Sequence, residues 1–117
     1  MKKSELVNQS IDFSICLVGF YKWLVYEKKE YVISKQILRS GTSIGANIHE
    51  AKYAVSRMDF INKMHIALKE ASETEYWLVV LNGTGYESKQ TMDLKLRCEG
   101  LKKMLVKSIN TSKKTKW

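Results

Sequence analysis

The stretch that decides the fold is SKQILRSGTSIGANIHEA, residues 34–51. Its apolar and small side chains recur at the three- and four-residue spacing of one helix face, which continues beyond this stretch to Val55: Ile37, Gly41, Ile44, Ile48, Ala51 and Val55. Gly41 and Gly45 each cost a helix interior about 1 kcal/mol relative to alanine. The simplest compensation is a close approach by the backbone of a neighbouring helix. We therefore predict a helix from Ser34 to about Val55, with a tightly packed face.

A loop is the alternative for the centre of this stretch. Ser-Gly-Thr-Ser at residues 40–43 could break a helix, because these residue types are common in turns. The apolar periodicity nevertheless continues through Ile44, Ile48 and Ala51. This continuity favours the helix.

Three further helices are expected, joined by short connections. They run from Ser4 to Lys28, from Arg57 to Asn82, and from Glu87 or Ser88 to between Ser108 and Thr111. Ser4 is a predicted N-cap, Ser56 with Asp59 resembles a capping box, and Gly83-Thr84-Gly85 suits a left-handed C-cap. Long helices with short connections pack antiparallel to their sequential neighbours. The sequence thus predicts an all-α fold, an antiparallel up-down-up-down four-helix bundle, as one domain over residues 1–117 with a basic tail at about 112–117.

The composition agrees with a helical protein that has an ordinary core. The 117 residues include no proline, which permits long unbroken helices and disfavours a turn-rich β architecture. Hydrophobic residues make up 44% and charged residues 27%, which is globular rather than disordered composition. The longest apolar tract, residues 11–26, is interrupted by polar and charged residues, so no membrane partner is expected. No uninterrupted apolar segment follows the two N-terminal lysines, so no signal peptide is expected.

The first helix carries two apolar lines side by side. The line predicted to face the core consists of Val7, Ile11, Ile15, Val18, Tyr21 and Val25. The second line consists of Phe13, Leu17, Phe20 and Leu24. Together they form an apolar arc wider than one bundle seam requires. Either this helix is unusually buried, or its second line docks on another copy of the chain; the second line is the predicted oligomer interface.

No pattern predicts catalysis, a cofactor or a metal site. His49 and His65 belong to neither a Glu-x-x-His nor an HExxH pattern. The acidic residues Glu70, Glu73 and Glu75 are interpreted as a solvated face or as polar contacts at a subunit boundary. We expect a protein that is not an enzyme and binds no cofactor or metal.

The two cysteines bear on the cellular compartment. Cys16 and Cys98 both fall inside helical patterns, where cysteine commonly fills space in a core as a reduced thiol. Disulfides are rare in the cytoplasm. A cytoplasmic location is therefore expected.

Positive charge is concentrated near the C-terminus. The chain has a net charge of +8, and residues 87–117 contribute +6 of it, from nine Lys and Arg against three Asp and Glu. The predicted nucleic-acid-binding residues of this segment are Lys95, Arg97, Lys102, Lys103, Lys107, Lys113 and Lys114. They form no base-reading motif, so they would contact phosphates of RNA or DNA with little sequence preference. Charge that serves only solubility is the alternative interpretation.

The run SKQILRSGTSIGANIHEA, residues 34–51, and within it most specifically residues 39–51, resembles the four-helix-bundle family encoded in 23S ribosomal RNA intervening sequences. So does ALKEASETEYWL, residues 67–78, followed by a Gly-Tyr turn at residues 85–86. The resemblance implies a homopentamer with a central channel and no established catalytic activity. It also implies kinship with the accessory variability protein of diversity-generating retroelements, a basic pentamer that binds nucleic acid and a reverse transcriptase. His49 and Ala51 depart from the family pattern, so no particular protein partner is carried over.

Two functions follow as expectations. The first is a non-catalytic oligomeric bundle that binds RNA or DNA non-specifically through a basic surface. The alternative is a structural or protein-interaction scaffold, such as a reverse-transcriptase or ribosome-associated partner, without nucleic-acid binding.

Overall fold

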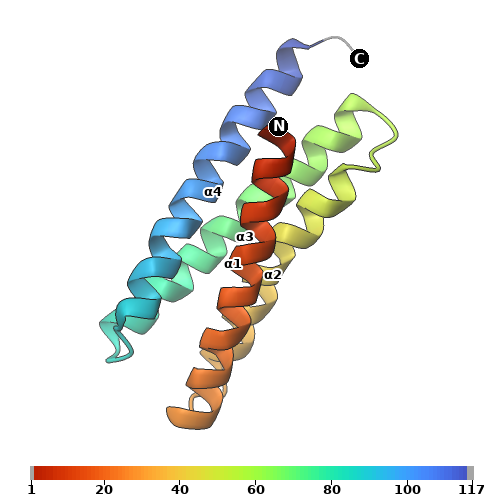
Figure 1. The fold of residues 1–117 in the computed structure, drawn as a ribbon. Helices are drawn as coiled ribbons and strands as arrows, with labels where there is room; N and C mark the ends of the chain where they lie inside the picture. Colours follow the sequence, from red (N-terminus) through yellow and green to blue (C-terminus); the bar gives the residue numbers. More distant parts are fainter. Residues whose placement is uncertain (1, 116–117) are drawn as a thin grey trace.

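A computed structural model of the protein describes residues 2–115, with side chains from Glu5 onward, as four long helices (Figure 1). They are α1 (Lys2–Lys22), which continues into the π-helical turn η1 (Trp23–Glu27), α2 (Ile33–Ala51), α3 (Arg57–Gly83) and α4 (Lys89–Lys114). Sequential helices run in opposite directions, and α4 packs against α1 to close the arrangement. The bundle measures 49 × 21 × 20 Å. The predicted all-α four-helix bundle is confirmed.

The side chain of Glu30 fixes the turn between α1 and α2. Its carboxylate accepts hydrogen bonds from three successive backbone N–H groups, at 3.2, 3.0 and 2.6 Å: Val32, Ile33 and Ser34. A helix start leaves such N–H groups without intrahelical partners. Lys29, just before this cap, has a left-handed backbone with φ 57°. The cap explains why α2 begins at Ile33, one residue before the predicted Ser34.

The other helix ends follow their capping residues. The Ser56 hydroxyl accepts the Asp59 N–H at 3.0 Å, but the Asp59 carboxylate accepts the N–H of Val55 instead of completing a capping box. Ser88 and Thr91 form a complete capping box at the start of α4. At the end of α3, Gly85 has φ 97°, as its predicted C-cap role requires.

Three predicted boundaries are wrong. The helix α2 ends at Ala51, where the backbone hydrogen bonds tighten to a three-residue spacing, and Val55, predicted as its last inward residue, is 91% exposed. The helix α1 already includes Lys2, so Ser4 lies inside it and is not an N-cap. The helix α4 continues to Lys114, so residues 112–114 are helical where a tail was predicted. Two lysines in the last turn of α4 favour this extension, because cations there interact well with the helix dipole. The rest of the predicted tail beyond Thr115 lies outside the described residues.

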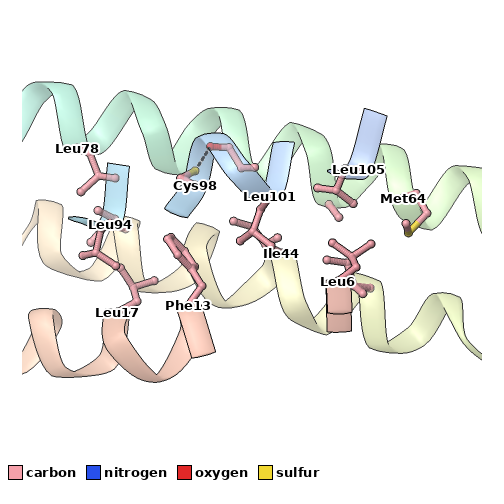
Figure 2. Packing of buried hydrophobic residues seen from close by; sticks show 14 of the residues in the cluster. Leu6, Phe13, Leu17, Ile44, Met64, Leu78, Leu94, Cys98, Leu101 and Leu105 are labelled. Atoms are coloured by element: carbon pink, nitrogen blue, oxygen red, sulfur yellow. Dashed lines mark hydrogen bonds between the residues drawn. The ribbon is translucent and has the colours of Figure 1, made fainter. Parts of the chain in front are cut away.

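The core is one hydrophobic cluster to which all four helices contribute. Phe13 and Leu17 from α1, Ile44 from α2 and Leu101 from α4 meet near its centre (Figure 2). The glycines of α2 lie at the contact with α1. A Cβ on Gly41 would overlap the Leu17 side chain, and one on Gly45 would lie 3.4 Å from the backbone oxygen of Ser10. A close approach is therefore found at Gly41, where it is made by a side chain and not by the predicted backbone, whereas Gly45 lies at an ordinary contact distance from α1.

The prediction of which line of α1 faces the core is wrong. Phe13, Leu17, Phe20 and Leu24, predicted as the oligomer interface, are at most 1% exposed and belong to the chain's own core. From the predicted core line, in contrast, Ile11 is 49% and Ile15 66% exposed. The second line therefore cannot serve as a surface between copies while the chain is folded.

The physical reason lies in the complete buried line of α1. Its members alternate strictly between four- and three-residue steps: Leu6, Ser10, Phe13, Leu17, Phe20 and Leu24. That is the 3.5-residue period of a bundle seam. Ser10 makes this line hard to recognise in the sequence, because a serine in a helix is usually expected to face solvent. In the structure its hydroxyl is satisfied by donating to the Val7 carbonyl at 2.7 Å.

None of the helices within residues 2–115 combines the length and the apolar character needed to cross a membrane.

Candidate nucleic-acid interface

The predicted basic residues all lie on α4 but do not share one surface. Lys103, Lys107 and Lys114 are exposed and lie on one side of the helix, because steps of four and seven residues return to nearly the same direction. They extend over about 16 Å along the helix axis. Lys113 is also exposed, whereas Lys95 is half-buried. Part of the predicted set therefore forms an outward-facing row.

Arg97 and Lys102 are engaged within the protein. The Arg97 guanidinium donates to the Asp93 carboxylate at 2.8 Å, one turn earlier on α4. The Lys102 ammonium donates to Glu75 of α3 at 2.9 Å. Each ion pair lowers the net charge that the side chain presents to a ligand. The Lys102 pair links α4 to α3, whereas the Arg97 pair lies within α4, and neither side chain presents a free cation.

The remaining lysines of α4 are free cations. In the described part of the chain Lys95, Lys103, Lys107, Lys113 and Lys114 take part in no ion pair. Residues 100–115 contain no acidic residue at all. The C-terminal half of α4 therefore carries unbalanced positive charge.

Two further cations lie at the same end of the bundle: Lys52, which follows α2, and Arg57, the first residue of α3. The Arg57 guanidinium donates to the backbone oxygen of Thr115 at 2.9 Å, and Lys52 lines a cavity together with Lys107. We call the resulting set the basic end: Lys52, Arg57, Lys103, Lys107, Lys113 and Lys114. Nearby acidic groups are partly occupied, since Glu50 pairs with Lys63 at 3.0 Å and Asp59 accepts the Val55 N–H. The sequence alone did not reveal this grouping, because it joins residues about 50 positions apart.

The acidic cluster of α3 makes contacts inside the chain. Arg39 of α2 pairs with Glu70 at 3.5 Å and with Glu73, which also accepts the Trp77 indole N–H at 3.1 Å. The hydrogen bond from Arg39, followed by that from Trp77, lowers the pKa of Glu73, and the same bond raises the pKa of Arg39. Neither predicted interpretation, a solvated face or polar contacts at a subunit boundary, included these contacts between helices of one chain. The cluster ties α3 to α2, and through Glu75 to α4.

The sequence of the chain matches the family described as 23S rRNA-intervening sequence protein over residues 2–107. The chain belongs to this family. The resemblance carried by residues 39–51 and 67–78 is thereby confirmed. No curated protein matches the sequence of this chain.

A solved structure from Bacteroides thetaiotaomicron VPI-5482 is similar to this 23S rRNA-intervening sequence protein. It is described as a protein with unknown function from the S23 ribosomal protein family. The two chains share 51% sequence identity and a TM-score of 0.91, over 94% of this chain and 99% of the other. Family and fold are therefore firmly placed, and neither description names a catalytic activity.

The groups that could support chemistry are few in this 23S rRNA-intervening sequence protein. Within residues 5–115 no three or more His, Cys, Asp or Glu side chains gather in a way that could hold a metal ion. Both cysteines are free thiols. Burial raises the pKa of Cys98 to about 12, and its S–H group donates to the Ala71 carbonyl at 3.3 Å. At neutral pH Cys98 is therefore a protonated core residue and not a nucleophile.

Proposed function

We propose that this 23S rRNA-intervening sequence protein is a non-catalytic, self-associating bundle that binds RNA or DNA through the basic end with little sequence preference. The observation that carries the proposal is the row of exposed lysines without ion pairs, Lys103, Lys107 and Lys114, on a stretch of α4 without acidic residues. Free lysines release counterions from a nucleic acid when they contact its phosphates. Ion-paired cations would contribute less to binding, since their charge is already partly compensated.

Salt-dependent binding tests this proposal. Fluorescence anisotropy with labelled RNA and DNA of arbitrary sequence should show binding that weakens steadily as salt rises. The variant Lys103→Glu/Lys114→Glu should bind at least about tenfold more weakly and lose about two units of the log–log salt slope. It removes two phosphate contacts and adds two repulsive charges at the basic end.

A matched control distinguishes the effect of the basic end on binding from the effect of the net charge. Lys35→Glu/Lys89→Glu changes the net charge by the same amount at the starts of α2 and α4, which lie at the opposite end of the bundle. This control should lose less than about threefold in affinity. Equal losses in the two double variants would reject the basic end as the binding surface. A wild-type protein without salt-dependent binding would reject the function itself.

Self-association is proposed through the exposed apolar row of α1: Ile11, Ile15 and Val18. Contiguous exposed apolar side chains are typical of contacts between proteins. By multiplying the basic ends, association would also convert weak phosphate contacts into avid binding. Light scattering should report an oligomer, with five copies implied by the family resemblance, and Ile15→Glu should dissociate it. Val79→Glu, an equally large change at an exposed apolar position of α3, is the control; a monomeric wild type would reject this part of the proposal.

The same apolar row is the observation that favours the second candidate, a structural or protein-interaction scaffold without nucleic-acid binding. That candidate predicts association through α1 and no salt-dependent anisotropy. The two measurements above therefore separate the candidates.

A further inference from the structure

A cavity of about 570 Å³ opens at the basic end, where α1 and α3 begin and α2 and α4 end. This volume lies within the range of about 300–1,000 Å³ that is usual for small-molecule sites. Leu6 and Met64, which lie at one end of the core cluster in Figure 2, belong to its wall. The cavity is lined by Glu5, Leu6, Val7, Ile48, Lys52, Phe60, Met64, Met104, Lys107, Ser108, Thr111 and Ser112. Every helix of the bundle contributes to it.

The lining divides into an apolar inner wall and a polar rim. The inner wall is made by buried or half-buried apolar side chains: Leu6, Val7, Ile48, Phe60, Met64 and Met104. The rim carries the hydroxyls of Ser108, Thr111 and Ser112 and the exposed ammonium groups of Lys52 and Lys107. This division suits a molecule with an apolar body and a polar head.

The charge of the rim indicates the head group. Lys52 and Lys107 form no ion pair with any residue that the structure describes, and Glu5 is the one acidic residue among those lining the cavity. The rim therefore presents two cations against one anion, a net charge of +1. A ligand with a single negative charge balances it, whereas a doubly charged phosphate would leave an excess negative charge. Lysine and hydroxyl groups also supply the donors that a carboxylate accepts.

We propose that this cavity binds a linear amphipathic carboxylate of the fatty-acid class, one molecule per chain. The hydrocarbon chain lies against Ile48, Met64 and Met104, and the carboxylate lies between Lys52 and Lys107. Unbranched methionine side chains adapt readily to such a flexible ligand. Lys52 and Lys107 belong both to this site and to the basic end, whereas Lys103 and Lys114 do not line the cavity.

Calorimetric titration with octanoate, decanoate and dodecanoate, each below its micelle concentration, tests the proposal. Affinity should rise roughly threefold to fourfold for each added methylene group, the gain expected for burying apolar surface. Dodecanoate should saturate at one molecule per chain. Dodecan-1-ol, which has the tail without the charge, should bind at least about tenfold more weakly than dodecanoate.

Three variants locate the binding. Lys107→Glu should lower the affinity for dodecanoate by at least about tenfold and leave the affinity for dodecan-1-ol unchanged. Lys103→Glu, one turn earlier on the same side of α4 and outside the lining, should change neither. Ser108→Trp, which places a bulky ring in the cavity from a half-buried position, should abolish binding of both ligands, and Thr111→Trp serves the same purpose if Ser108→Trp fails to fold.

Several results would overturn the proposal. Equal losses from Lys107→Glu and Lys103→Glu would mean that only the surface charge attracts the ligand. Unchanged binding in folded Ser108→Trp, or no saturation below the micelle concentration, would exclude the cavity. If dodecanoate does not bind and Ser108→Trp dissociates an oligomer in light scattering, a second copy of the chain is the occupant. Nucleic-acid binding by Ser108→Trp should equal that of the wild type, so this proposal and the proposed function fail separately.

Discussion

Gly41 of α2 lies directly against Leu17 of α1. A Cβ on Gly41 would overlap Cδ2 of Leu17 and would lie 3.3 Å from its Cγ and 3.6 Å from Cε2 of Phe13. Both neighbours are buried in the core, so neither can swing out into solvent. The glycine is therefore what allows α1 and α2 to meet at this depth.

Gly41→Ala should destabilise the protein by up to about 2 kcal/mol. The gain of about 1 kcal/mol in helix propensity is outweighed by overpacking, which costs about 1–3 kcal/mol and here displaces a fully buried leucine. Urea unfolding would measure the change. In a double-mutant cycle with Leu17→Ala, which removes the overlapping atoms, the cost should largely disappear.

Gly45→Ala is the matched control in the same helix. Its Cβ would meet Ser10 and Ser14 at 3.4 Å, an ordinary contact distance. The propensity gain should then dominate, and the variant should be up to about 1 kcal/mol more stable than the wild type. Stabilisation by both substitutions would contradict the close approach at Gly41.

Lys29→Gly should stabilise the protein by up to about 1 kcal/mol. Lys29 holds a left-handed backbone with φ 57°, a conformation that costs a residue with a Cβ about 1–2 kcal/mol and glycine almost nothing. Thermal or urea unfolding provides the measurement. Lys28→Gly, one residue earlier, should instead be destabilising, because Lys28 has φ −97° and its ammonium lies 5.1 Å from the centre of the Trp23 ring.

The two cysteines should differ sharply in their reaction with iodoacetamide. Cys16 is partly exposed, whereas Cys98 is buried and its pKa is raised to about 12, so at pH 8 Cys98 remains a protonated thiol. Mass spectrometry of the folded protein should find a single adduct, on Cys16. Both thiols should react in denaturant. Rapid modification of Cys98 under native conditions would mean that the core around Ala71 opens easily.

The stabilising effect of Glu73 should disappear in acid. Its hydrogen bonds from Arg39 and Trp77 lower its pKa in the folded state, so its carboxylate stabilises the fold above the pKa of the unfolded chain. This contribution is lost as the pH falls through the lowered folded-state pKa. The difference in unfolding free energy between wild type and Glu73→Gln should therefore be positive near pH 7 and shrink below about pH 4.

The control for this titration is Glu87→Gln, at an exposed glutamate that pairs with no cation in the described chain. The same change with pH in both variants would mean that the effect does not come from the contacts of Glu73 with Arg39 and Trp77. A constant difference between wild type and Glu73→Gln from pH 7 to pH 3 would mean that the Arg39 contact does not depend on the charge of Glu73.

Much of the fold could be predicted from the sequence because it is encoded locally. The caps at Ser56 and Ser88, the left-handed glycine at Gly85 and the packing glycine Gly41 all act within one turn or on one neighbouring helix. The first helix was harder. Its two apolar lines have the same mean spacing and differ only in the order of their three- and four-residue steps, and the buried Ser10 interrupts the correct one.

The candidate site could be predicted only in part. Positive charge on α4 is visible in the sequence, but whether a cation is free depends on partners far along the chain. Lys102 meets Glu75, 27 residues away, and Arg57 meets the end of α4, 58 residues away. The cavity has no signature in the sequence, since it arises from the ends of four helices that meet only in the folded protein.

The placement of Glu5 and Ser112 on one cavity has a consequence for the order of the chain. The start of α1 and the end of α4 lie at the same end of the bundle, because the four helices cross it an even number of times (Figure 1). A short linker can therefore join the first helix to the last, and new ends can be cut at the Gly83–Gly85 connection on the far side. We expect such a circularly permuted protein to retain every helix contact described above. The contacts between the four helices, and not the order in which the helices are synthesised, would then determine the architecture.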